Sequence, residues 1–300
     1  MEHMAKFHLS FATKEEFEYR FQIFKNTDKE INEVNGNSNN TFTVNHNRFS
    51  TWSADERKKL MGKKPDMRNE KEEKSYKPVS KNNLTEDPID WRTKGAVNPI
   101  QNQGSCGSCW AFSSAAALEG KYFLKYGNLP KFAEQQWVDC DDICYGCNGG
   151  LEVFAFRYAQ EFKIEESKDY PYTGKADQAC AYDADKGIAN TKTWGELYPG
   201  IESELIEQLA IGPTCVSVYA ANNYFLLYDK GILNTQDCVG RLDHAVTAVG
   251  WGVEGDQKYL IVRNSWGTDW GEEGYIRMAL DGDGRGVCGV LLDSTFVNVA

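Results

Sequence analysis

Apolar side chains in the first part of the chain recur at the spacing of an amphipathic helix. Between residues 14 and 35, with charged residues among them, the apolar positions include Phe17, Phe21, Phe24, Ile31 and Val34. The pattern predicts a helix over residues 14–35 that ends in the Asn-rich stretch behind it. A short strand at residues 41–44 and a second helix at residues 54–61, ended by Gly62, are expected next.

A charged stretch follows. Residues 63–83 are poor in apolar side chains and are interrupted by Pro65 and Pro78. Such a stretch cannot bury enough apolar surface to fold by itself, so we interpret it as an extended, cleavable linker. The chain therefore divides into a leading segment, residues 1–83, and a main domain that begins at about Leu84 and runs to residue 300.

The main domain changes character along its length. Helical spacing occurs at residues 110–126, 134–138 and 151–162. Stretches rich in Val, Ile and Tyr predict strands at residues 214–220, 245–251, 259–264 and 274–278. We expect an α+β fold that is helical first and β second. Because 300 residues are many for one core, two packed lobes with an appendage are expected.

Charge is distributed unevenly between the two parts. Residues 1–83 hold 16 Lys and Arg against 13 Asp and Glu, whereas residues 84–300 hold 17 against 31. Opposite net charges of +3 and −14 favour docking of the leading segment on the main domain. The acidic main domain argues against nucleic acid or an anionic membrane as its partner. No run of about 18 apolar residues occurs, so no membrane span is expected.

Cysteine usage suggests an oxidising compartment. The chain has nine cysteines, and the odd count leaves one thiol over, as a nucleophile requires. The first residues lack the basic and apolar regions of a signal peptide, and we expect a secretory leader to have been removed ahead of them. The expected location is a lysosome or another acidic vacuole, or outside the cell.

Candidate chemistry lies in three short motifs. They are Gln103-Gly-Ser-Cys-Gly-Ser-Cys109-Trp, Leu-Asp-His244-Ala and Asn264-Ser-Trp-Gly. Cys109 lies where a Gly- and Ser-rich loop enters a helical pattern, and a helix N-terminus stabilises a thiolate. His244 is the one histidine of the main domain and can act as its base. Asn264 could orient that imidazole, and the Gln103 amide could join the Cys109 N–H in an oxyanion hole.

The two Cys-x-x-Cys pairs allow other interpretations. Cys106 with Cys109, and Cys144 with Cys147, could form a redox pair or a four-cysteine zinc site. The 34 residues between the pairs exceed common zinc spacings, and no βαβ pattern surrounds the first pair. We therefore expect no metal and no cofactor.

These motifs together resemble the papain family, especially its cathepsin L-like branch. The resemblance implies a helical lobe at about residues 95–205 and a β-barrel lobe at about residues 206–300 with the N-terminal stretch. It implies a cysteine endopeptidase that acts on proteins and peptides, with Cys109 as nucleophile and His244 as base. An exopeptidase of this kind would need a second histidine over the cleft, and an inactive homologue would usually lack Cys109.

Further site residues are implied by the same resemblance. Trp266 would shield the contact between His244 and Asn264, Trp270 would lie on the leaving-group side, and Gly149 and Gly150 would bind substrate backbone. The pocket for the second residue before the cleaved bond would be lined by Leu151, Glu152, Ser217, Leu242, Ala245 and Asp293, with Asp243 nearby. Because two of these are acidic, we hypothesise that the pocket accepts Arg or Lys as well as Leu or Phe.

The resemblance also implies a disulfide pattern. The expected pairs are Cys106–Cys147, Cys140–Cys180 and Cys238–Cys288, which leaves Cys109 free. Cys144 and Cys215 are then additional, and we expect them to be unpaired and to fall in different lobes.

The leading segment resembles the family's inhibitory pro-segment. Matching positions are Glu16, Arg20, Ile23, Phe24, Ile31 and Asn35. Thr27 replaces a usual Asn, and Thr51 replaces the aspartate of an Asn-x-Phe-x-Asp motif at Asn47. We expect a latent, monomeric zymogen whose own leading segment inhibits it until acid protonates carboxylates. Cystatin-type inhibitors are expected partners. The alternative is that the leading segment only assists folding.

Overall fold

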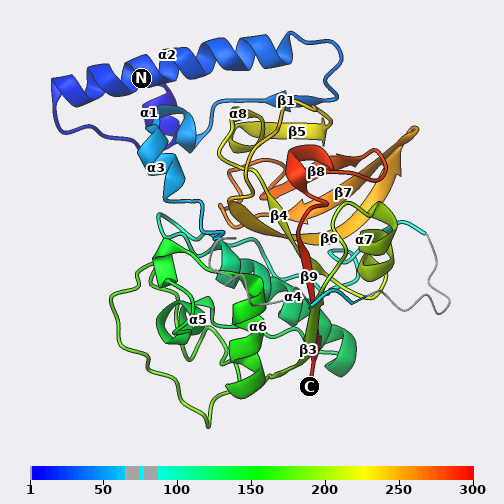
Figure 1. Cartoon of the computed structure of the whole chain (residues 1–300). Coiled ribbons are helices and arrows are strands. Elements are labelled where there is room, and N and C mark those ends of the chain that lie inside the picture. The colour runs from blue at the N-terminus through cyan, green and yellow to red at the C-terminus, as the bar shows by residue number, and fades with distance from the viewer. Residues whose placement is uncertain (1, 65–74, 78–86) are drawn as a thin grey trace.

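The computed structural model describes residues 2–64, 75–77 and 87–300 (Figure 1). Its α-helices are α1 (Glu2–Lys6), α2 (Lys14–Asn35), α3 (Ala54–Lys58), α4 (Cys109–Tyr126), α5 (Glu134–Cys140), α6 (Glu152–Glu161), α7 (Glu202–Leu209) and α8 (Asn223–Leu226). Its strands are β1 (Phe42–Val44), β2 (Ile89–Asp90), β3 (Thr191–Glu196), β4 (Thr214–Val218), β5 (Tyr228–Leu233), β6 (His244–Glu254), β7 (Gln257–Arg263), β8 (Tyr275–Leu280) and β9 (Ser294–Val299). Short 3₁₀ turns are η1 (Arg48–Thr51), η3 (Gly146–Asn148) and η4 (Val287–Gly289).

The helical lobe is built around α4. Its first thirteen residues, 109–121, are all buried, and small side chains such as Ala115 and Ala117 let neighbouring elements approach closely. The bulk of the lobe's core comes from α5, α6 and the start of α4, through Trp110, Trp137, Phe154 and Phe156. The helix ends at Gly127, which takes the left-handed conformation that suits glycine (φ 79°). This packing fixes the end of α4 that carries Cys109.

The sheet lobe contains mostly antiparallel strands in the order β1-β5-β8-β7-β6-β4-β9-β3, with β2 paired to β6. The expected barrel is not closed, because the described strands form an open path from β1 to β3. Side chains of β9 face both cores: Phe296 packs in the core of the sheet lobe, whereas Val297 and Val299 pack in the core of the helical lobe. The sheet therefore bridges both lobes instead of belonging to one (Figure 1).

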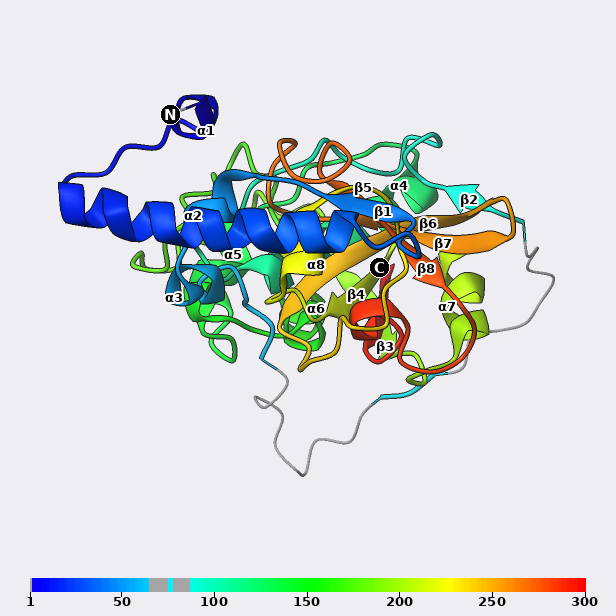
Figure 2. The same ribbon diagram turned by 90° about the horizontal axis from the view of Figure 1, so that it is seen from above.

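The leading segment lies over the sheet lobe and then descends toward the helical lobe (Figure 1). Viewed from above, α2 crosses β1 and α8 (Figure 2). β1 pairs antiparallel with β5, with Phe42 opposite Gly231. The Asn35 side chain bonds both the N–H and the C=O of Val44, each at 2.9 Å, and so ties the end of α2 to β1.

Two expectations about the leading segment need correction. Phe17 and Phe21 do not face a core: they are 38% and 49% exposed, and their rings stack on each other. Only Thr27 and Ile31 of α2 are buried. α3 ends at Lys58 instead of residue 61, because Lys59 caps it and single turns carry the chain to Met61. The predicted boundary near Leu84 lies outside the described residues.

The disulfides have the expected pairing, Cys106–Cys147, Cys140–Cys180 and Cys238–Cys288. Cys109, Cys144 and Cys215 are free and buried. The expectation that Cys144 and Cys215 lie in different lobes is wrong in one respect: Cys215 is on β4, but both side chains contribute to the core of the helical lobe. Within the described residues, no helix is both long and apolar enough to cross a membrane.

Candidate active site

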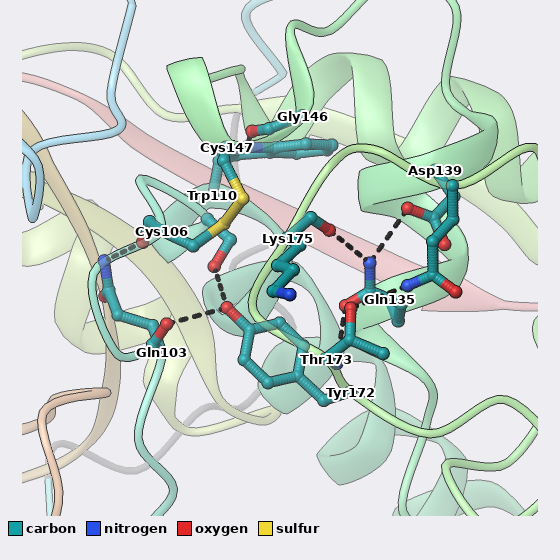
Figure 3. The surroundings of a disulfide bond; sticks show 12 residues. Gln103, Cys106, Trp110, Gln135, Asp139, Gly146, Cys147, Tyr172, Thr173 and Lys175 are labelled. Carbon is teal, nitrogen blue, oxygen red and sulfur yellow. Dashed lines mark hydrogen bonds between the residues drawn. A yellow bond between two sulfur atoms is a disulfide. The ribbon is translucent and has the colours of Figure 1, made fainter.

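Cys109 is the first residue of α4, at the end of a loop that a disulfide holds in place. The Gly107 N–H donates to the carbonyl of Cys147, 2.9 Å away, next to the Cys106–Cys147 bond. Tyr172 supports the same loop, because its hydroxyl donates to the Gln103 carbonyl at 2.8 Å (Figure 3). The loop therefore presents Cys109 in a fixed position.

A second layer of contacts holds Tyr172 itself. The Gln135 amide of α5 donates to the Asp139 carboxylate and to the Lys175 carbonyl, and its oxygen accepts from the Thr173 N–H (Figure 3). The 173–175 stretch is thereby fastened to α5. Rigid support of this kind is what a site needs if its geometry is to be kept within a fraction of an ångström.

His244 is the first residue of β6 and is fully buried. Its Nε2 lies 2.8 Å from Asn264 Oδ1, which also accepts from the Ser265 N–H at 2.8 Å. An amide oxygen only accepts, so Nε2 carries the hydrogen. The indole of Trp266 stacks on the imidazole with centroids 4.7 Å apart, and covers this contact from water.

The other ring nitrogen of His244 is left for the nucleophile. Nδ1 is buried and has no hydrogen-bond partner among the described residues. The N–H of the next residue, Ala245, points at Cys109 Sγ from 3.4 Å. The structure therefore brings the sulfur from α4 and the imidazole from β6 together at the meeting of the two lobes.

Gln103 stands where the sequence places an oxyanion donor. Its Oε1 accepts from the Ser265 hydroxyl at 2.7 Å, which fixes the amide so that Nε2 donates. Nε2 bonds the Cys106 carbonyl at 2.8 Å and the Leu60 carbonyl at 3.0 Å. Leu60 belongs to the leading segment, so a carbonyl of that segment already occupies the donor.

Residues 60–64 of the leading segment lie against the substrate-binding positions. The Gly62 carbonyl accepts from Gly150 N–H at 2.8 Å, and the Lys64 N–H donates to the Gly150 carbonyl at 3.2 Å. The Lys63 N–H donates to the Asp243 carbonyl at 3.0 Å. A Cβ on Gly62 would lie 1.9 Å from the Gly107 carbonyl oxygen, so no larger residue fits this approach to Cys109.

The side chain of Lys63 occupies an acidic pocket. Its Nζ lies 2.5 Å from Glu152 Oε2 and 2.9 Å from Asp293 Oδ2, and the side chain is 3% exposed. Burial alone would lower the pKa of Lys63, but the attraction of Asp293 and Glu152 outweighs it and raises that pKa. Sequence reasoning missed Lys63, because composition assigned it to the linker. The available signal was its place directly after Gly62.

The remaining predicted residues are placed as follows. Ser217 donates to Asp293 Oδ2 at 3.2 Å and so joins the acidic pocket. Gly149 faces the leading segment, where a Cβ would lie 2.6 Å from the Gly62 carbonyl oxygen. Trp270 packs edge-on against Trp266 at 5.4 Å. Leu151 caps the start of α6 and is buried, whereas Leu242 is partly exposed.

Burial works against the expected thiolate while the leading segment is docked. Burial raises the pKa of Cys109 to about 12, against smaller opposing effects of the Ala245 and Gly62 N–H groups. Burial also lowers the pKa of His244 to about 4, although its bond to Asn264 acts in the other direction. Burial therefore disfavours both charged forms, the thiolate and the imidazolium. The sequence argument considered the helix N-terminus and an imidazolium beside Cys109, and did not include the segment that covers the thiol.

Two arginines stabilise the docked leading segment, Arg48 against the main domain and Arg20 within the segment itself. Arg48 bonds the Trp266 carbonyl and lies 3.5 Å from Asp269. Arg20 pairs with Glu56 and also donates to the Thr51 carbonyl at 3.1 Å. At the two positions that depart from the resembled motif, Thr51 is buried and Thr27 donates to the Ser50 carbonyl. Both threonines therefore have structural roles of their own.

Comparison with known proteins agrees with this geometry. Residues 85–297 match the papain family cysteine protease model, and residues 2–56 match the cathepsin propeptide inhibitor domain. Papain from Carica papaya is 40% identical over 93% of this chain and 80% of its own. A cathepsin L-like proteinase from Phaedon cochleariae is 36% identical over 94% of this chain and 87% of its own.

A solved structure gives the same result. The recombinant stem bromelain precursor aligns with a TM-score of 0.86 and 32% identity, over 99% of this chain and 96% of its own. The chain therefore belongs to the papain family of cysteine proteases and is a cysteine-type endopeptidase. More particularly, it is a cathepsin L-like proenzyme whose leading segment is a propeptide inhibitor domain that acts on its own protease.

Proposed function

We propose that Cys109 and His244 carry out peptide-bond hydrolysis through a covalent acyl-enzyme. The Cys109 sulfur attacks the substrate carbonyl carbon as a thiolate, and its proton resides on His244. The imidazolium then donates that proton to the leaving amine, so the C–N bond breaks and a thioester remains. A water molecule, deprotonated by His244, hydrolyses the thioester. The observation that carries the proposal is that Asn264 holds Nε2 of His244, whereas Nδ1 has no hydrogen-bond partner in the described part of the chain and the adjoining Ala245 N–H lies 3.4 Å from Cys109 Sγ.

Three further residues would support the reaction. The Gln103 amide would donate to the oxyanion of each tetrahedral intermediate, since its orientation is already fixed by Ser265. Asn264 would hold the imidazole in one tautomer, and Trp266 would keep water from that bond. These groups are set before substrate arrives, which avoids the cost of organising them during the reaction.

We also propose that residues 60–64 make the full-length chain latent. They occupy the Gln103 donor, the Gly150 backbone and the acidic pocket together. Gly62 also lies against Cys109, and burial of this thiol disfavours the reactive thiolate. A segment that only assisted folding would have no need to fill these positions.

Activation is proposed to follow acidification. The leading segment carries +3 and the main domain −14, so docking favours ionised carboxylates on the main domain. This contribution is present above the ordinary carboxyl pKa and is lost as the pH falls through it. Protonation would then weaken docking and allow cleavage near Leu84.

The test is acid incubation of the full chain, followed by N-terminal sequencing and labelling with an epoxysuccinyl thiol inhibitor. We expect no labelling at pH 7, and cleavage near residue 84 with labelling of Cys109 after acidification. Cys109→Ser should abolish both activity and labelling. A full-length chain that is fully active at pH 7 without processing would contradict latency.

Location and partners follow from the same reasoning. Three disulfides suit an oxidising compartment, and acid activation suits a lysosome, another acidic vacuole or secretion into acid. We propose a monomer that cystatin-type inhibitors can block in the exposed cleft. Sedimentation of the matured enzyme and titration with a cystatin would test both points.

A further inference from the structure

The acidic pocket filled by Lys63 is enclosed by both lobes. Glu152 is the first residue of α6 and is 1% exposed, and Asp293 directly precedes β9. Lys63 Nζ bridges one oxygen of each, at 2.5 and 2.9 Å. The pocket thus holds two carboxylates around one ammonium group, with the lysine side chain almost fully buried.

When the leading segment dissociates, Glu152 and Asp293 lose the positive charge of Lys63. Glu152 then loses its bond to Lys63, and its other oxygen, Oε1, is already buried without a hydrogen-bond partner in the described structure. An uncompensated buried carboxylate is costly, and an apolar side chain in the same space would not compensate it. A cationic side chain would.

The pairing of Lys63 with Gly150 indicates which substrate residue reaches this pocket. Lys63 is the bridge partner of Gly150, the residue whose N–H and C=O both bind the leading segment. The N–H and C=O of Gly150 define the position opposite this residue, and that position is the same for a chain bound in either direction. The neighbouring Gly62 lies against Cys109. Lys63 therefore marks the place of the second residue before the cleaved bond.

The distances from Lys63 Nζ to the two carboxylates also indicate that the pocket suits lysine better than arginine. At contact distances of 2.5 and 2.9 Å, the carboxylates close directly on a single nitrogen. An arginine carries its central carbon at that depth and its terminal nitrogens about one bond farther, so both carboxylates would have to retreat. A compact ammonium fits without such movement.

We propose that the matured enzyme selects lysine as the second residue before the cleaved bond, and that Glu152 and Asp293 together determine this choice. The inference rests on the proposed hydrolytic function and names its substrate class. The leading segment, in this view, inhibits by presenting the preferred side chain in the preferred pocket.

The test compares fluorogenic dipeptides that share Arg before the cleaved bond and carry Lys, Arg, Leu or Phe at the second position. The acid-matured enzyme should show a kcat/KM for Lys about tenfold or more above that for Leu and Phe, and above that for Arg. Glu152→Gln should lower the Lys-to-Leu ratio on the order of 30-fold or more, and Asp293→Asn by less. Glu161→Gln, at the exposed end of the same helix, is the matched control and should keep the ratio.

Each outcome separates the inference from the function on which it rests. A Leu or Phe rate equal to the Lys rate, with normal thiol labelling, would overturn the lysine pocket and leave the protease intact. An Arg rate equal to or above the Lys rate would overturn the choice of lysine. Absence of labelling and of all turnover would instead refute the proposed function. If Glu152→Gln does not fold, the wild-type profile and Asp293→Asn still decide.

Discussion

The outer and inner parts of the leading segment bind in different ways. The outer part, residues 14–51, is held by apolar packing and strand pairing: Phe42, Val44 and Phe49 enter the core of the sheet lobe. The inner part, residues 60–64, also buries Leu60 and Met61 in that core, but it differs in adding backbone hydrogen bonds, a close glycine contact and one ion-pair cluster in the cleft. The outer part therefore anchors the segment away from the cleft, and the inner part blocks the chemistry. Variants of each part should separate these two roles.

The largest expected loss of stability follows from a substitution in the outer part. Phe49→Ala removes a fully buried ring that packs against Trp266 at 5.3 Å. It should destabilise the docked segment by about 3–5 kcal/mol, measured by chemical denaturation of the full chain. Phe21→Ala, whose ring is half exposed, is the matched control and should change little. Equal effects of the two changes would remove the distinction between anchored and exposed positions on this segment.

A substitution in the inner part should cost less stability, and its main consequence should be faster labelling of the Cys109 thiol. Gly62→Ala would place a Cβ 1.9 Å from the Gly107 carbonyl oxygen, so the segment must lift away from Cys109. Overpacking of this kind costs about 1–3 kcal/mol. The rate of thiol labelling of the unprocessed chain at pH 7 should rise by about 5- to 150-fold. Gly36→Ala, at the far end of α2, should leave that rate unchanged, and full protection of the Gly62→Ala thiol would contradict the role given to the inner part.

The Arg20–Glu56 pair tests which carboxylates respond to acid. The bond to Arg20 lowers the pKa of Glu56 to about 2, against the opposing effect of burial. A lowered pKa means that its stabilisation is present above about pH 4.5 and is lost as the pH falls toward 2. Glu56→Gln should thus cost less than about 1 kcal/mol, equally at pH 7 and pH 5. A cost that disappeared between those two pH values would identify this pair as the acid trigger.

The smallest expected effect concerns α1. Burial, with smaller contributions from His46 and Lys6, lowers the pKa of His3 to about 4. The released histidine binds a proton below about pH 6.5 and the docked one does not, so acid weakens the packing of α1 between those values. Limited trypsin cleavage at Lys6 should therefore be faster at pH 5 than at pH 7 when corrected for protease activity. His3→Phe should make the corrected rates equal.

Sequence predicted the elements whose pattern is long and local. α2 has the expected bounds, and α4 begins one residue earlier than expected. β3 and β9 were not expected, because short stretches such as Thr191–Glu196 acquire their strand character only by pairing with each other across about a hundred residues. The exposed Phe17 and Phe21 show the converse error, since periodicity cannot say which turn of a helix meets a partner.

The candidate site shows the same division. Cys109, His244, Asn264 and Gln103 were found from motif and spacing, and the structure brings them together. The raised pKa of the buried Cys109 and the cation in the pocket were not predicted, because both depend on where a distant segment docks. Composition identified residues 63–83 as unable to fold alone, but not that Lys63 folds against another part of the chain.

The pairing of β1 with β5 gives maturation a second consequence. When the leading segment leaves, the sheet ends at β5, and backbone groups that had bonded Thr41 and Phe42 become open to water. An exposed edge strand pairs readily with other strands. The released propeptide can therefore bind β5 again, and concentrated mature enzyme becomes prone to self-association. Prompt degradation of the released propeptide would then matter as much for lasting activity as the cut itself.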